Sequence, residues 1–210
     1  MDNILLQRLF IYVIIVLSAV FHEYAHAFIA YRLGDNTAKD MGRLTLNPFK
    51  HLDPIGTVFL PLLLLFTSGI FIGWAKPVPY NPYNLTDQKR GSLKVALAGP
   101  ATNLLIALIL GIVIRFYPMI APTMYGSATP FFLFLTVIIY INIFLGLFNL
   151  IPLPPLDGSK IFMDLFPRQQ HTIAQLGLFG IFFALIIAYF IVPPIANILF
   201  WIFTGYSTAF

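Results

Sequence analysis

His22, Glu23 and His26 are the residues of this chain whose types and spacing could do chemistry. His22 and His26 are four positions apart, so on an α-helix they share one face and can bind one metal ion through imidazole nitrogens. Glu23 follows the first histidine, where its carboxylate can act as a general base toward water at that metal. It is also the only glutamate among the 210 residues. The three residues therefore predict a zinc site with an adjacent base.

The surroundings of these residues strengthen the interpretation. The pattern H-E-x-x-H is typical of zinc proteases, although it also occurs by chance in long soluble chains. Here it lies inside an apolar run, residues 5–33, which is long enough to cross a membrane as a helix. Ionisable side chains are costly in a bilayer, so they need a partner or a function. The alternative interpretation is a set of polar contacts between helices.

The composition indicates a polytopic membrane protein with a single domain over residues 1–210. The chain is 59% hydrophobic and 10% charged, whereas soluble domains have about 25% charged residues. The net charge of +4 comes from cations beside apolar runs, which fits cytoplasmic loops better than nucleic-acid binding. The absence of cysteine excludes disulfides and thiolate zinc ligands.

The apolar runs predict an all-α fold with five to six transmembrane helices. The clear spans are residues 5–33, 95–116, 131–151 and 172–192, while residues 195–203 either span or lie at the interface. Residues 53–73 are interrupted by proline and glycine, so they either cross or re-enter. The distribution of lysine and arginine favours the re-entrant arrangement. Residues 39–46 predict a small membrane-associated β-hairpin around Gly42.

A catalytic zinc needs a third protein ligand beside the two histidines. With no second glutamate, the candidates are the aspartates, His51 and His171. Asp157 stands out because it follows a run of three prolines at the broken end of an apolar span. The spacing alone also allows a solvent-facing aspartate that caps the next helix.

Three segments in this order resemble the motifs of the site-2 proteases, which are intramembrane zinc metalloproteases. They are residues 22–26 (HEYAH), 98–103 (AGPATN) and 148–158 (FNLIPLPPLDG). The resemblance extends over most of the chain, and it is to the compact group without PDZ or CBS domains. Residues 47–56 and 73–78 are similar to further segments of that group.

The resemblance implies that Asp157 is the third zinc ligand, with His22 and His26, and that Glu23 is the catalytic base. It also implies that Asn149 helps to stabilise the oxyanion, as a side-chain amide can do in a site with little water. Asn103 and Asn142 are expected to bridge helices. His51 is expected to order its loop, and His171 to lie at a membrane interface.

The predicted function is zinc-dependent intramembrane endopeptidase, with one Zn²⁺ per chain and a transmembrane protein or peptide as substrate. The lipid bilayer is the expected surrounding, and no nucleic-acid partner is expected. The chain is expected to be a multi-pass protein of a bacterial or archaeal cell membrane, with its active site toward the cytoplasm. The re-entrant arrangement of residues 53–73, which places most lysines and arginines on one side, supports that orientation.

Two other classes of function compete with this prediction. A polytopic metal-binding transporter would use the same histidines to pass an ion, and it predicts charged residues in the other spans. As candidates for such a path we find asparagines at positions 103, 142 and 149, without a charged relay. A catalytically silent homologue that binds membrane proteins would usually lose the glutamate, and Glu23 is present.

Overall fold

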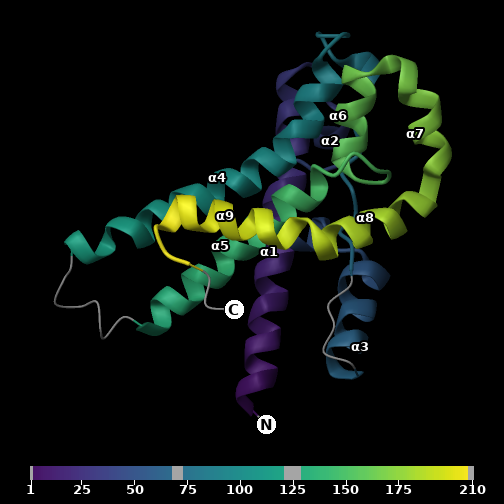
Figure 1. Cartoon of the computed structure of the whole chain (residues 1–210). Helices are drawn as coiled ribbons and strands as arrows, with labels where there is room; N and C mark the ends of the chain where they lie inside the picture. Colours follow the sequence, from purple (N-terminus) through teal and green to yellow (C-terminus); the bar gives the residue numbers. More distant parts are fainter. Residues whose placement is uncertain (1, 68–72, 121–128, 208–210) are drawn as a thin grey trace. The chain divides into compact units, whose positions relative to one another are not determined.

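The computed structural model describes residues 2–67, 73–120 and 129–207, and most of them are helical (Figure 1). The long helices are α1 (Asp2–Arg32), α4 (Gly91–Ile120) and α5 (Thr129–Asn149). They confirm the helices predicted at 5–33, 95–116 and 131–151. Each contains a stretch that is long and apolar enough to cross a membrane. An α-helix can cross a lipid bilayer because it satisfies the hydrogen bonds of its own backbone N–H and C=O groups.

The predicted count of five to six transmembrane helices is not supported. The described residues contain three helices that could span, or four if one bent pair is counted as a span. That pair is Pro167–Leu176, which includes α7 (Gln170–Leu176), and α8 (Gly180–Phe190). Its two parts meet at 96° and replace the single span predicted for 172–192. The break falls at Gly177, whose φ of +49° favours glycine. The last helix, α9 (Val192–Thr204), has only 13 residues and begins with its prolines in the first turn.

The chain divides into two compact units, an N-terminal unit of Met1–Gly99 and a C-terminal unit of Pro100–Phe210. Each is described by itself below, and the single domain over residues 1–210 stays a prediction. In the N-terminal unit, α1 presents small buried side chains, Ala27 and Ala30, to the short helix α2 (Thr37–Asp40) and to the loop that precedes α4. These alanines allow the polypeptide backbones to approach closely.

The β-hairpin predicted for residues 39–46 is wrong, and no described residue belongs to a β-strand. A short helix, α2 (Thr37–Asp40), occupies the start of this stretch. Gly42 has a φ of +64°, which suits a hairpin turn but here ends the helix. Its N–H donates to Lys39, and the N–H of Arg43 donates to the carbonyl of Ala38. These two bonds form a Schellman cap. Gly42 therefore makes a turn, as predicted, but the turn ends a helix and does not join two strands.

Residues 53–67 form a π-helical turn, Pro54–Phe59, that continues into α3 (Leu60–Thr67). The chain then comes back to its starting point. The N–H of Trp74 donates to the carbonyl of Gly56 at 3.0 Å, and the hydroxyl of Thr57 donates to the carbonyl of Trp74 at 2.7 Å. The two ends of the predicted 53–73 segment therefore lie side by side, which favours the re-entrant alternative over a crossing. Residues 68–72 within it lie outside the described residues.

The C-terminal unit is organised around α5 and α9, which lie side by side (Figure 1). Ile139 and Ile143 of α5 are fully buried against Ala196 and Phe200 of α9. The amide of Asn103 on α4 donates to the side chain of Asn142 on α5 at 2.9 Å, and both residues are buried. The expectation that these two asparagines bridge helices is confirmed.

The helix α6 (Asp157–Leu165) follows α5 after a proline-rich turn. The turn packs its apolar residues, Ile151 and Leu156, against Ala184 and Ala188 of α8. This packing fixes the direction in which α6 begins.

Candidate zinc site

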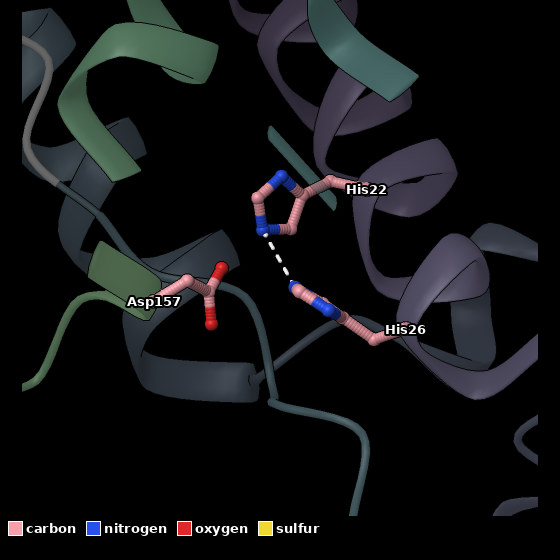
Figure 2. A group of neighbouring side chains, drawn as sticks. All are labelled: His22, His26 and Asp157. Atoms are coloured by element: carbon pink, nitrogen blue, oxygen red, sulfur yellow. Dashed lines mark hydrogen bonds between the residues drawn. The ribbon is translucent and has the colours of Figure 1, made fainter. Parts of the chain in front are cut away.

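The two histidines predicted as zinc ligands face each other on α1. Their Nε2 atoms are 3.0 Å apart, and both side chains are buried (Figure 2). Two nitrogens bound to one tetrahedral zinc at the usual bond length of about 2.0–2.1 Å would be separated by roughly 3.3 Å. The pair is thus already close to the spacing that one zinc ion requires.

The other ring nitrogen of His26 fixes the protonation state that a metal needs. Its Nδ1 lies 2.6 Å from the carbonyl oxygen of Val95, at the start of α4. A carbonyl can only accept a hydrogen bond, so Nδ1 carries a proton, and in the neutral ring Nε2 then presents its lone pair. A second hydrogen bond of this kind is the usual support for a metal-binding histidine.

Gly99 makes room for the imidazoles. A Cβ at this position would overlap with Nε2 of His26 and would lie 2.5 Å from Nε2 of His22. Only a residue without a side chain lets this part of α4 pass the two rings. The 98–103 motif thus contributes directly to the histidine pair through Gly99.

Glu23 lies one position after His22 and is partly buried. Its Oε2 accepts a hydrogen bond of 2.7 Å from the backbone N–H of Val78. The carboxylate is therefore held by the loop before α4, and it can accept a proton from water through its remaining lone pairs.

Asp157 lies in the C-terminal unit as the first residue of α6, and its side chain is buried. Lys160 approaches one carboxylate oxygen at 3.3 Å, which supplies a positive partner to a buried carboxylate. Gly158 follows because a Cβ there would collide with the carbonyls of Leu150 and Ile151. The backbone of the turn thus fixes the position of Asp157 tightly.

Asn149 is the last residue of α5, and its amide donates to the carbonyl of Leu145 at 3.0 Å. This bond leaves the second amide N–H for another acceptor. His51 is buried and orders its loop through the carbonyl of Thr45, at 2.7 Å, as expected. His171 is exposed.

Sequence reasoning missed the residues that support this site through their backbone. The carbonyl of Val95 and the N–H of Val78 bind His26 and Glu23, yet a valine carries no chemical signal in a sequence. Arg43 was missed as well: it is buried, and its guanidinium donates to the carbonyl of Lys76 at 2.7 Å. Arginine is rarely buried. The sequence alone does not show that Arg43 is buried, so its role could not be predicted.

The comparisons with known proteins agree with the geometry. Residues 119–192 match Peptidase family M50, a stretch that contains Asn149 and Asp157. The chain is 37% identical over 201 residues to a protein of Bacillus subtilis (strain 168) named "Putative zinc metalloprotease YwhC", covering 91% of this chain and 84% of the relative.

A second relative, "Putative zinc metalloprotease Rip2" of Mycolicibacterium smegmatis, is 33% identical, with coverage of 90% of this chain and 70% of the relative. A more distant one, "Zinc metalloprotease MJ0392" of Methanocaldococcus jannaschii, is 24% identical over 76% of this chain and 35% of its own length. No solved structure matches. The family match, together with the two relatives that match over 91% and 90% of this chain, shows that the chain belongs to Peptidase family M50 and that it is a zinc metalloprotease of the membrane.

Proposed function

We propose that this protein is an intramembrane endopeptidase, which hydrolyses peptide bonds in or near the transmembrane segments of membrane-protein substrates. One observation carries the proposal. The histidine pair and Glu23 lie on α1 within Ile4–Arg32, a stretch long and apolar enough to span a membrane. A metal held by these residues would lie among apolar side chains, which favours a membrane-embedded substrate over a soluble one.

His22, His26 and Asp157 are the proposed zinc ligands. All three side chains are buried, and together they offer two imidazole nitrogens and one carboxylate oxygen. Catalytic zinc sites use three such ligands and keep one position open. Nδ1 of His26, held by Val95, supports the assignment, because it leaves Nε2 unprotonated.

Zinc, when bound, supplies a Lewis acid that polarises the scissile carbonyl and makes water more acidic. Glu23 takes a proton from the attacking water and returns it to the leaving amine. The amide of Asn149 donates to the negative charge that develops on the carbonyl oxygen. Because a helical substrate hides its carbonyls in hydrogen bonds, the substrate must unwind before attack.

Zinc analysis of the purified protein tests the ligand set. We expect about one zinc per chain in the wild type and a strong reduction in His22→Ala and in Asp157→Ala. His171→Ala and Asp164→Ala are the matched controls, since each deletes the same chemical group elsewhere in the chain. Wild-type zinc content in Asp157→Ala would remove this residue from the ligand set.

Cleavage of a panel of transmembrane peptides in lipid vesicles tests the reaction. Glu23→Gln should keep its zinc and lose activity by about 10²- to 10⁴-fold, the usual contribution of a general base, because glutamine cannot take a proton from water. Full peptidase activity in Glu23→Gln would contradict the mechanism.

We also propose that residues 53–73 enter and leave the membrane on the cytoplasmic side. The bonds between Trp74 and residues 56–57 support this arrangement. Single cysteines at Thr37 and Gln88, in a chain without cysteine, should both react with a membrane-impermeant thiol reagent from the cytoplasmic side. Labelling of the two positions from opposite sides would show that the segment crosses.

A further inference from the structure

Glu23, the base in the proposed function, is held by a backbone group rather than by a side chain. The N–H of Val78 donates to its Oε2 at 2.7 Å, across 55 positions of sequence. Among the described residues this is the only hydrogen bond that the Glu23 side chain makes. We infer that Val78 is a positioning residue: its N–H fixes the direction of the Glu23 carboxylate and leaves Oε1 to accept the proton from water.

The physical reason lies in the length of the glutamate side chain. It has three rotatable bonds, and a general base must stay within about 2.6–3.2 Å of the proton that it takes. A charge-assisted hydrogen bond to one carboxylate oxygen selects one arrangement of these bonds. The bond can only do so if its donor is itself fixed.

Val78 meets this requirement because both neighbouring peptide units are restrained. Pro77 and Pro79 flank it, and the ring of each proline fixes its own φ. Lys76 is held on both of its backbone groups: its N–H donates to His51 at 3.0 Å, and its carbonyl accepts from Arg43 at 2.7 Å.

Arg43 holds this segment through two of its backbone carbonyls. Its guanidinium is buried, and Nη2 reaches the carbonyls of Lys76 and Pro77 at 2.7 and 3.4 Å. Its Nε is buried with no hydrogen-bond partner among the described residues. A buried cation is costly unless it is well paired. The hydrogen bonds from Arg43 to these carbonyls therefore hold Lys76 and Pro77 in position.

The segment is anchored at its two ends as well. At one end the N–H of Trp74 donates to Gly56, and at the other the N–H of Asn81 donates to Oδ2 of Asp35 at 2.7 Å. Val78 therefore lies between two fixed points of a short loop, and its N–H has little freedom to follow the glutamate.

The inference rests on the proposed function of Glu23, and it predicts a specific kinetic effect. Val78 N–H donates to the base, so it is not available to a substrate. Its removal should lower kcat and leave KM unchanged, because substrate binding keeps all its partners. We expect a decrease of about 10-fold, the scale of one lost hydrogen bond to a charged group.

The sharpest test replaces Val78 by α-hydroxyvaline. This change turns the backbone amide into an ester, which removes the N–H and keeps the side chain. Val78→Pro removes the same donor genetically, and Val78→Ala is the matched control because it trims the side chain but keeps the donor. Zinc content, Tm, kcat and KM are measured with one transmembrane peptide in vesicles, with Glu23→Gln alongside.

The expected result is a lower kcat for the backbone-ester variant and for Val78→Pro at unchanged KM and zinc content, and a smaller decrease in kcat for Val78→Ala, which keeps the donor. An unchanged or raised kcat in the ester would overturn the inference, and so would a loss of zinc, which would assign the N–H to the metal site. If Val78→Pro does not fold, the ester decides. Activity in Glu23→Gln would instead overturn the proposed function, which keeps the two failures distinct.

Discussion

The two units satisfy their buried polar side chains in different ways. In the N-terminal unit these side chains reach backbone groups far away in the sequence. The pairs are His26 with Val95, Asp35 with Asn81, Arg43 with Lys76, and Thr57 with Trp74. In the C-terminal unit the hydroxyls and amides mostly bond to carbonyls three or four residues earlier. Examples are Asn142 to Ile138, Ser159 to Leu156, and Thr204 to Phe200.

The difference reflects two tasks. A helix in lipid has no water for its polar side chains, so a bond to its own backbone is the simplest way to satisfy them. The N-terminal unit uses its polar side chains to fix non-helical segments, and one of these segments holds Glu23. We therefore expect substitutions in the N-terminal unit to affect the site through other segments, and those in the C-terminal unit to act locally.

The largest expected effect tests the N-terminal unit at Gly99. In Gly99→Ala the new methyl group would occupy the space of both Nε2 atoms, so the imidazoles must separate. We expect loss of zinc and of cleavage. Elemental analysis checks the first, and Ala101→Ser, at an exposed position of the same helix, is the control. Full zinc occupancy in Gly99→Ala would show that α4 can move away from the histidine pair.

The next effect concerns Asn149, the residue of the C-terminal unit with a proposed catalytic role. Asn149→Ala should lower kcat by about 10²-fold, the scale of one lost oxyanion donor. Thr136→Ala also removes a bond to the carbonyl four residues earlier, in the same helix. If both variants lose the same amount of activity, the effect of Asn149 is structural and its bond to Leu145 is its whole role.

A third prediction concerns the stability of the N-terminal unit at low pH. Burial raises the pKa of Asp35, but hydrogen bonds from Thr37, Asn84 and Asn81 outweigh it and hold the pKa below its ordinary value. A lowered pKa contributes stability above the ordinary value, near 3.9, and that stability is lost as the pH falls through the folded-state pKa.

Unfolding of the wild type and of Asp35→Ala, followed against pH, measures this contribution. The variant should be less stable by about 1–3 kcal/mol at neutral pH, since buried donors lose their acceptor. The difference should shrink in acid. A constant difference at all pH values would mean that the carboxylate charge contributes nothing.

The smallest effect is expected for the pair Asn103 and Asn142, a long-range contact within the C-terminal unit. A double-mutant cycle with Asn103→Leu and Asn142→Leu should give a coupling of about 0.6 kcal/mol, and at most about 1.7, as found for hydrogen bonds between membrane helices. Asn142 keeps its local bond to Ile138 when Asn103 is replaced. A coupling of several kcal/mol would remove the contrast between the two units.

The sequence was sufficient for features set by residue type and period. The helices α1, α4 and α5 follow from apolar runs, and the end of α1 follows from Gly34, whose φ is +103°. The histidine spacing led directly to the facing Nε2 atoms. The stretch around Gly42 failed because a glycine with positive φ serves a hairpin turn and a helix cap equally well.

Two other features could not be predicted, for a different reason. The bend at Gly177 depends on how α8 packs, since a single glycine in an apolar run is tolerated in many membrane helices. The roles of Val78 and Val95 lie entirely in their backbone groups, so their side chains give no indication of them. What holds the proposed base is thus less visible in the sequence than the base itself.

The loop that carries Val78 has one more consequence, for aggregation. From Trp74 to Asn81, with Ala75 and Tyr80 aside, each backbone N–H is either absent in a proline or already donated within the N-terminal unit. An unpaired strand edge normally invites a second copy, because it offers donors and acceptors alternately. This segment is not part of a sheet, and because most of its N–H groups are already used, it offers few donors for a reciprocal ladder with a second copy. The bonds that hold the segment in place therefore also guard the protein against edge-to-edge aggregation.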